Sequence, residues 1–354
     1  MYHIDDYDYT LPADRIAQSP CSKRDESRLL RLDRTTGATQ HHRFSDLPNL
    51  LRPDDLLVVN DTAVIPARLY GKKASGGRVE LLLLDYATSI AAEPDATRVE
   101  CKCLVRSAKP CREGTSFLFD SCLTARVISC NGETVTMELT SEEPIAQVID
   151  TIGIVPLPPY IHRSDPGGMA SEDGTRYQTV YARQKGAIAA PTAGLHFTEE
   201  LLHQLRSIGV RCVPITLHVG YGTFVPVRVE DIRRHTMHAE WFHLSEEAAN
   251  EINAAKIQGR RVVAVGTTVV RTLEFCTEED GLLQERSGAC DLFIYPGYRF
   301  RTVDAMITNF HLPKSTLLML VSAFTDRTMI LRTYEEAVRE GYRFYSYGDA
   351  MLIE

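Results

Sequence analysis

The sequence lacks any apolar stretch long enough to cross a membrane. Its longest, Leu317–Phe324, is far shorter than the roughly 20 residues that a membrane helix needs. The first residues, Met1–Asp8, are acidic and aromatic, without the basic start and apolar run of a signal peptide. We therefore expect a cytoplasmic protein that makes no contact with membranes.

Cysteine is present, but not in a pattern typical of disulfides or bound metals. The nine cysteines are an odd number at irregular spacing, and no two of them form a C-x-x-C pair. Cys101 and Cys103 form a single C-x-C. Reduced thiols suit a cytosolic protein, and the sequence predicts no metal site.

Three familiar glycine signatures are also missing. The chain contains no G-x-G-x-x-G, no Walker A sequence and no G-x-S-x-G. Gly220-Tyr221-Gly222 is only a G-x-G, and no helix is expected after it. These absences disfavour a dinucleotide-binding enzyme, a P-loop NTPase, an α/β-hydrolase and a methyltransferase with the usual Rossmann-type fingerprint.

Excess positive charge is lacking too, since the formal net charge of the chain is −8. Such a balance disfavours sequence-blind binding to long nucleic acids. It leaves room for a folded RNA bound by a local basic patch. Short basic clusters that suit such a patch occur at Lys72-Lys73, Arg106 with Lys109, Arg233-Arg234, Arg260-Arg261 and Arg299 with Arg301.

Residues 66–153 differ in texture from the rest of the chain. Helical patterns are nearly absent there, and short strands are expected at 78–84, 98–105, 116–119, 123–127 and 135–139. Asn131-Gly132 is typical of a tight hairpin turn. We expect this segment to form an all-β domain, a small barrel or Greek key, inserted into a larger domain.

The remaining residues, 1–65 and 154–354, alternate strands with helices, which predicts a discontinuous, mixed α/β domain. Leu56–Val59 is expected as a buried strand. The polar, Gly-rich stretch Ser164–Thr175 is expected as a mobile loop. Helices are expected to begin after N-capping hydroxyl residues, namely Thr198, Ser245, Ser315 and Thr333.

Four segments of the C-terminal half share an unusual composition of small residues, hydroxyls and often a histidine. Each lies where a strand ends or a helix begins; the segments are 189–197, 217–224, 264–268 and 308–316. Small residues allow a ligand to approach the backbone, and hydroxyls with helix N-terminal amides donate to oxygens. Because ligands bind at the carboxyl ends of strands in open α/β sheets, the four segments together predict a small-molecule site.

In this order, these segments resemble the S-adenosylmethionine:tRNA ribosyltransferase-isomerase family of queuosine biosynthesis. The resemblance covers essentially the whole chain. It is also carried by the opening Tyr7-Asp8-Tyr9-Thr10-Leu11-Pro12, by the block Asn60-Asp61-Thr62, by Tyr177–Tyr181, by Ile294-Tyr295-Pro296-Gly297 and by the closing stretch Tyr342–Met351.

The resemblance implies a specific reaction. The ribosyl portion of S-adenosylmethionine is transferred to 7-aminomethyl-7-deazaguanine at the wobble position of a tRNA anticodon. Epoxyqueuosine forms, while adenine and methionine leave, so S-adenosylmethionine is a consumed co-substrate. The implied partners are this co-substrate and the anticodon stem-loop of tRNA, bound by a monomeric chain.

Within that reaction a base must remove a C5′ proton next to the sulfonium, and the ribose hydroxyls must be held. The candidates for proton transfer are His196, His218, His311, Glu240 and Asp349. Arg271 is expected to pair either with the carboxylate of the co-substrate or with Glu274 on its own helix. Substrate-binding candidates are Asn60, Asp61, Thr62, Arg68, Pro191, Thr192, Ala193, Gly194, Gly220, Gly222, Thr223, Phe224, His238, Gly266, Thr267, Thr268, Arg271, Tyr295, Gly297, Asn309, Lys314, Ser315 and Tyr347. Tyr298 and Tyr345 join Tyr295 and Tyr347 as possible platforms for an unstacked base.

The chain departs from the family pattern at a few positions. Ala63 and Val225 stand where the family usually has arginine, and Val269 where it usually has serine. Ala239-Glu240-Trp241 stands where the family usually has Ser-Glu-Tyr. These changes leave open an altered contact with phosphate or carboxylate.

Two other functions compete with this expectation. One is a different tRNA-modifying enzyme that consumes S-adenosylmethionine, such as a methyltransferase. The other is a non-catalytic RNA-binding module with the β insert as its binding domain. Adenine release, S-adenosylhomocysteine release, or RNA binding without turnover distinguishes the three.

Overall fold

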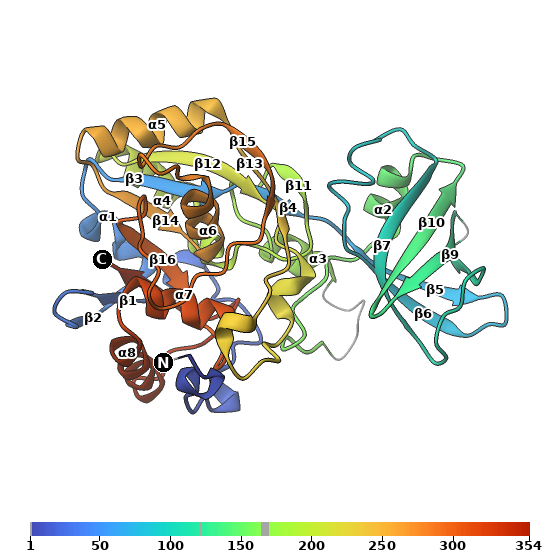
Figure 1. Cartoon of the computed structure of the whole chain (residues 1–354), viewed down its shortest axis with the longest axis horizontal. Coiled ribbons are helices and arrows are strands. Elements are labelled where there is room, and N and C mark those ends of the chain that lie inside the picture. Colours follow the sequence, from blue (N-terminus) through green and yellow to red (C-terminus); the bar gives the residue numbers. More distant parts are fainter. Residues whose placement is uncertain (1, 121, 164–169) are drawn as a thin grey trace.

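The computed structural model describes residues 2–120, 122–163 and 170–354. Two parts are visible in Figure 1, a layered α/β part and a β-barrel to one side of it. The mixed α/β fold with a barrel is the fold expected from the sequence.

A nine-stranded sheet forms the centre of the α/β part. Its strands, in spatial order, are β15 (Arg286–Cys290), β13 (Glu240–Leu244), β12 (Arg211–Leu217), β3 (Leu56–Asn60), β14 (Val262–Val265), β16 (Ala305–Asn309), β17 (Ala350–Ile353), β1 (Arg28–Leu32) and β2 (Thr39–Arg43). The four central strands β12, β3, β14 and β16 run parallel. The outer strands pair antiparallel with their neighbours, apart from the parallel pair β1 and β17.

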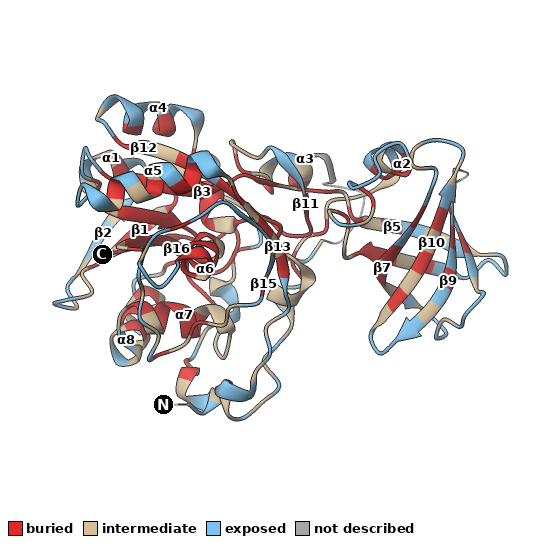
Figure 2. Cartoon of the chain, turned by 45° about the horizontal axis from the view of Figure 1, so that its top comes forward, coloured by how far each residue is buried: buried red, intermediate tan, exposed pale blue. Residues whose placement is uncertain are grey.

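Helices cover both faces of this sheet. Leu57 and Val59 of β3 pack on one face against α1 (Leu47–Leu50) and α4 (Glu199–Ser207). Leu56 and Val58 face the opposite side, because alternate strand residues point to opposite faces. The helices on that side are α5 (Glu246–Ile257), α6 (Thr267–Cys276), α7 (Thr316–Phe324) and α8 (Arg327–Arg339). Covered by helices on both faces, β3 and β16 are buried along their whole length (Figure 2).

The barrel is closed and antiparallel. Its strands, in order around the barrel, are β10 (Thr134–Ser141), β7 (Arg98–Ser107), β6 (Arg78–Leu83), β5 (Arg68–Lys73), β8 (Ser116–Phe119) and β9 (Leu123–Asn131). Buried residues alternate with exposed ones along β7 and β9, and with half-buried ones along β10 (Figure 2). The expected hairpin turn at Asn131-Gly132 is confirmed, since Asn131 pairs with Thr134 across it.

The chain enters and leaves the barrel at one place. Arg68 and Ile154 exchange backbone hydrogen bonds of 3.1 and 2.9 Å. Gly153 is required there, because a Cβ at this position would lie 2.1 Å from the carbonyl oxygen of Pro66. Beside this junction, β4 (Thr62–Val64) pairs in parallel with β11 (Gln184–Ala187). We propose residues 66–153 as an inserted domain, because both ends of that segment meet here.

Several expectations about single elements were wrong. The insert is not purely β, since α2 (Ile145–Ile152) packs its apolar side on the barrel core. Thr333 does not cap a helix; α8 begins after Asp326, and Thr333 donates to the carbonyl of Met329 inside it. Of the loop expected at Ser164–Thr175, residues 164–169 lie outside the described part, and Ala170–Arg176 forms helix α3.

Short 3-10 turns complete the described elements: η1 (Ile4–Tyr7), η2 (Ala13–Arg15), η3 (Arg24–Glu26), η4 (Phe44–Asp46), η5 (Thr192–His196), η6 (Tyr221–Phe224) and η7 (Ile232–Arg234). None of the helices in the described ranges has the length and apolar character needed to cross a membrane.

Candidate active site

The four segments singled out in the sequence meet at one edge of the central sheet. Asn60, Leu217, Val265 and Asn309 end the parallel strands β3, β12, β14 and β16, so the residues that follow them lie at a common edge. Asp349 reaches the same edge, because Ala350 of the antiparallel β17 pairs with Asn309. The edge is where open α/β sheets bind their ligands.

A cavity of about 390 Å³ opens at this edge, which is within the ~300–1,000 Å³ typical of small-molecule sites. The predicted residues that line it are Thr192, Thr223, Asn309, His311, Lys314 and Ser315. Much of the remaining wall is apolar or aromatic, with Tyr160, Tyr177 and Tyr345 beside Val219 and Phe310. This is the balance of apolar walls and few polar groups expected of a site that binds a nucleoside-sized molecule.

His311 is the histidine that lines this cavity. Its Nε2 lies 2.9 Å from the hydroxyl oxygen of Thr308, and its Nδ1 makes no hydrogen bond to the described residues. The backbone around it is held on both sides, by the hydroxyl of Tyr334 at 3.1 Å and that of Tyr9 at 2.5 Å. Burial lowers the pKa of His311 to about 3, so the imidazole is neutral at pH 7.

Asn309 connects the cavity to a second histidine, His196. The amide nitrogen of Asn309 lies 3.1 Å from Nε2 of His196 and 3.1 Å from the carbonyl oxygen of Tyr345. Because an amide nitrogen only donates, Nε2 accepts and Nδ1 carries the proton, facing the hydroxyl of Ser27 at 2.7 Å. Burial lowers the pKa of His196 to about 3. His196 therefore fixes the orientation of the Asn309 amide. Oδ1 of Asn309 has no hydrogen-bond partner among the described residues.

Tyr345 and Lys314 give the cavity wall its unusual backbone. Both have positive φ, 73° at Tyr345 and 57° at Lys314, a conformation that is uncommon for side chains larger than glycine. The buried hydroxyl of Tyr345 has no hydrogen-bond partner among the described residues. Its ring packs 4.3 Å from that of Tyr160, whose hydroxyl lies 2.5 Å from the Ser346 hydroxyl. Lys314 pairs with Asp5 and Asp8 at 2.7 and 3.1 Å.

Glu240 and Arg271 form a buried ion pair beside the cavity. Oε1 of Glu240 accepts from the backbone N–H of Gly220 at 2.9 Å and from the Thr223 hydroxyl at 3.3 Å. Arg271 also donates to the carbonyls of Cys290 and Leu292. Of the two partners expected for Arg271, Glu274 was wrong, because Glu274 instead accepts from backbone N–H groups of 301–303. Glu240 thus holds the segment around Gly220 in place.

His218 lies at the end of β12, in a closely packed position. Its Nδ1 is 2.7 Å from the Thr62 hydroxyl, and its ring stacks on Trp241 at 5.0 Å. A Cβ at Gly186 would come within 2.6 Å of the ring. Burial lowers the pKa of His218 to about 4. These contacts fix the imidazole of His218 in a position outside the cavity.

The block 60–62 ties the strand ends together. Asn60 accepts from the N–H groups of Thr62 and Leu217 and donates to the carbonyl of Leu217 at 2.9 Å and to the Thr268 hydroxyl at 3.4 Å. Asp61 accepts from the Thr216 hydroxyl at 2.7 Å, and burial raises its pKa. The block therefore shapes the sheet edge without lining the cavity.

Asp349 and Tyr347 lie on the far side of Asn309. The Asp349 carboxylate accepts from the N–H groups of Arg28 and Arg343 at 3.0 and 2.8 Å. Tyr347 lines a small cavity with His196, and its hydroxyl lies 3.4 Å from the Asp173 carboxylate. Asp349 is thus fully engaged in holding the closing turn.

The glycine-containing segments position neighbouring side chains. Ala193 and Gly194 lie in η5, which Pro191 precedes, and a Cβ on Gly194 would lie 2.2 Å from the Tyr181 hydroxyl oxygen. Gly266 has φ of 92° and precedes Thr267 at the start of α6. Gly222 leaves room for His238, because a Cβ on this glycine would lie 2.6 Å from the Cβ of the histidine, and Phe224 ends η6.

Tyr295, Gly297 and Arg68 are among the predicted residues that do not line the cavity. Tyr295 packs on Tyr2 and Phe293, and Gly297 is near Tyr2. Arg68 belongs to the barrel and pairs with Glu80 at 3.3 Å. Of the altered positions, Val225 lines the cavity, Ala63 pairs with Lys185 between β4 and β11, and Val269 is buried in α6.

Sequence reasoning missed part of the cavity wall. Tyr160 and Tyr177 lie in the Pro-rich exit and in the 177–181 block, and both contribute rings. The prolines beside Tyr160 indicated a rigid backbone, but no pattern in the sequence indicated that Tyr160 or Tyr177 would line the cavity. Within the described residues, no cluster of three or more His, Cys, Asp or Glu side chains is placed to hold a metal ion.

Comparison with known proteins extends over the whole chain. The family model of queuosine biosynthesis proteins matches residues 4–353. Proteins named S-adenosylmethionine:tRNA ribosyltransferase-isomerase from Moorella thermoacetica and Geobacter metallireducens are 51% and 48% identical over 356 and 351 residues, with 99% of each chain covered. The crystal structure of an S-adenosylmethionine tRNA ribosyltransferase from Thermotoga maritima is 35% identical, with a TM-score of 0.56, and covers 99% of this chain and 100% of that one. The resemblance seen in the sequence is confirmed, and the chain belongs to the queuosine biosynthesis protein family.

Proposed function

We propose that this chain is an S-adenosylmethionine:tRNA ribosyltransferase-isomerase. It transfers and isomerises the ribosyl portion of S-adenosylmethionine onto 7-aminomethyl-7-deazaguanine in the tRNA anticodon. Epoxyqueuosine forms, and adenine and methionine leave. The observation that carries this proposal is a nucleoside-sized cavity at the carboxyl ends of the central strands, in a chain that matches its family from end to end.

His311 is the base that we propose for removing the C5′ proton next to the sulfonium. Among the described residues that line the cavity there is no aspartate or glutamate. Lys314 is already paired with two carboxylates, and burial raises the pKa of Tyr345 well away from neutrality. His311 is neutral at pH 7, so it carries an unprotonated ring nitrogen, and this is why we propose it as the base.

Asn309 and Tyr345 are the side chains that we propose for binding the co-substrate. Each has a buried oxygen without a partner in the described structure, and an unpaired buried polar group costs about 1–3 kcal/mol. A ribose hydroxyl or the amino group of adenine would satisfy Oδ1 of Asn309. The aromatic walls from Tyr160 and Tyr345 suit the face of a nucleobase.

His196, Glu240 and Asp349 have positioning roles in this proposal. His196 orients the Asn309 amide, Glu240 fixes Gly220 and Thr223, and Asp349 holds the turn that presents Tyr345. We further propose that the enzyme works as a monomer in the cytoplasm, where its tRNA substrate is found.

One assay tests the proposal. The protein is incubated with S-adenosylmethionine and tRNA that carries 7-aminomethyl-7-deazaguanine, and the products are separated. Adenine release in step with tRNA modification is expected. Formation of S-adenosylhomocysteine would identify a methyltransferase instead, and binding of tRNA without turnover would indicate a binding module.

A further inference from the structure

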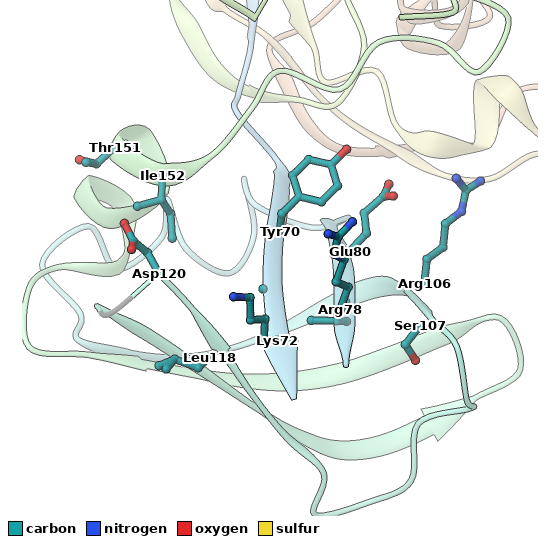
Figure 3. Close-up of a pocket in the computed structure, with 12 residues that line it drawn as sticks. Tyr70, Lys72, Arg78, Glu80, Arg106, Ser107, Leu118, Asp120, Thr151 and Ile152 are labelled. Carbon is teal, nitrogen blue, oxygen red and sulfur yellow. The ribbon is translucent and has the colours of Figure 1, made fainter. Parts of the chain in front are cut away.

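The outer face of the barrel carries a cavity of about 1,180 Å³ that the proposed reaction does not use (Figure 3). Tyr70 and Lys72 of β5, Arg78 of β6 and Arg106 of β7 line it. The alternate residues of these strands, such as Leu69 and Val79, are buried in the barrel core. The pleat of the strands therefore places these polar side chains on one outer surface, called here the barrel groove.

The cations of the barrel groove form no ion pair with any residue that the structure describes. Lys72 and Arg78 lie directly opposite each other across β5 and β6, an arrangement of like charges that destabilises a sheet. The nearby Glu80 pairs with Arg68 at 3.3 Å. No described residue forms an ion pair with Lys72, Arg78 or Arg106, which leaves Asp120 as the acid at the rim of the groove. An external anion would relieve the repulsion between Lys72 and Arg78.

Apolar side chains are exposed beside these cations. Tyr70 is 44% exposed and Leu118 is 50% exposed. Gly71 lies between Tyr70 and Lys72, and a Cβ there would come 2.6 Å from the Leu118 carbonyl oxygen, so glycine lets β5 and β8 meet under the groove. Exposed aromatics beside lysine and arginine are typical of surfaces that bind unstacked bases and their phosphates.

The barrel groove leads toward the candidate active site. A second cavity, of about 440 Å³, shares Tyr70, Glu80 and Arg106 with the groove and is also lined by the Pro-rich exit, 156–159. That cavity in turn shares Pro159 with the candidate active site. Figure 3 shows Tyr70 and Arg106 extending from the barrel toward the loops of the α/β part.

We propose that the barrel groove binds the sugar–phosphate backbone of the tRNA substrate, with Lys72, Arg78 and Arg106 on phosphates and Tyr70 against a base. The inference rests on the proposed function, because that function supplies the RNA. The unpaired cations suit a polyanionic partner. They would offset the repulsion between that partner and a chain with a net charge of −8. The groove then guides the anticodon loop to the cavity at His311.

The test measures tRNA affinity without S-adenosylmethionine, so that binding is separated from turnover. Lys72→Glu/Arg78→Glu is expected to weaken tRNA binding at least tenfold. It should also reduce the slope of log K against the logarithm of the salt concentration by about 1.4. The matched control, Lys102→Glu/Arg126→Glu, changes the net charge equally at exposed positions of β7 and β9 outside the groove. It is expected to bind nearly as tightly as the wild type. Thermal unfolding checks that both pairs fold.

A second pair of variants tests the stacking contact. Tyr70→Ala is expected to weaken tRNA binding roughly 5- to 150-fold, whereas Tyr70→Phe keeps it. In turnover, the groove variants should raise KM for tRNA and leave KM for S-adenosylmethionine unchanged.

The proposal that the barrel groove binds tRNA would be overturned by unchanged tRNA affinity in Lys72→Glu/Arg78→Glu, or by an equal loss of affinity in the control pair. Failure of the proposed function gives a different result, since a wild-type protein would then release no adenine however well it bound tRNA.

Discussion

Asn309 and His196 share a hydrogen bond of 3.1 Å that joins the wall of the candidate active site to a buried imidazole. The contact fixes the amide nitrogen, while the amide oxygen has no hydrogen-bond partner among the described residues. Neither residue is near the other in the sequence. Their meeting follows from the sheet, because β16 delivers Asn309 to the edge against which η5 packs.

Removing the cavity imidazole should stop the chemistry while the fold persists. His311→Gln and His311→Ala are expected to lower kcat by about 10²–10⁴, the usual contribution of a general base. Single-turnover adenine release at saturating substrates measures the loss. His243→Ala is the control, because the imidazole of His243, on β13, hydrogen-bonds Ser287 of β15 and does not line the cavity, so the substitution is expected to leave activity unchanged. Full activity in His311→Ala would remove His311 from the reaction.

The enclosed histidines should make stability depend on pH in acid. The pKa values of His196 and His311 are lowered by burial from 6.5 to about 3, so both are neutral when folded and take up a proton on unfolding. Their contribution is complete above about pH 6.5 and is lost as pH falls toward 3, at up to about 1.4 kcal/mol per pH unit for each histidine. Urea unfolding between pH 7 and 4.5 measures this slope.

His196→Gln should flatten that pH profile, whereas His203→Gln, at an exposed position of α4, should leave it as it is. An unchanged slope in His196→Gln would show that His196 is not neutral in the fold.

The hydroxyl of Tyr345 should contribute to the binding of S-adenosylmethionine and not to the stability of the fold. Tyr345→Phe removes a buried group that has no partner in the described structure, so the free energy of unfolding is expected to stay equal or to rise. KM for S-adenosylmethionine is expected to rise about tenfold, the value of one hydrogen bond. Tyr160→Phe provides the contrast, since it loses the contact with Ser346 and should lower stability. A destabilised Tyr345→Phe with normal KM would contradict the binding role.

Breaking the ion pair between Glu240 and Arg271 should be costly. Arg271→Met leaves a buried carboxylate unpaired, and the expected loss in the free energy of unfolding is about 3–5 kcal/mol. Arg98→Met breaks an exposed pair with Glu138 and should cost no more than about 1 kcal/mol. Urea titration of both variants tests the difference, and equal small losses would mean that the buried pair contributes little.

Local patterns in the sequence located many elements well. Thr198 caps α4, Ser245 caps α5 and Ser315 caps α7, each through its side chain, because capping chemistry is confined to one turn. Most barrel strands followed from alternation of apolar and polar residues. Strand β5 was missed, since Gly71 and two lysines interrupt its pattern, and the need for glycine arises only where β8 crosses it.

The site was predicted by composition but not by geometry. Three histidines occupied similar segments, and only tertiary packing separates His311, on the cavity, from His196 behind Asn309 and from His218 beneath Trp241. Arg271 pairs with Glu240, 31 residues away, instead of with Glu274, which is one turn along the same helix. Such choices depend on which strands become neighbours, and no local pattern encodes them.

A crystal structure of the chain with bound S-adenosylmethionine tests most directly whether the cavity at His311 is the active site. We expect the ribose within hydrogen-bonding distance of His311 and Oδ1 of Asn309, with the adenine against Tyr160 and Tyr345. A ligand bound instead beside His218, in the small cavity at His196 and Tyr347, or in the barrel groove would contradict this expectation.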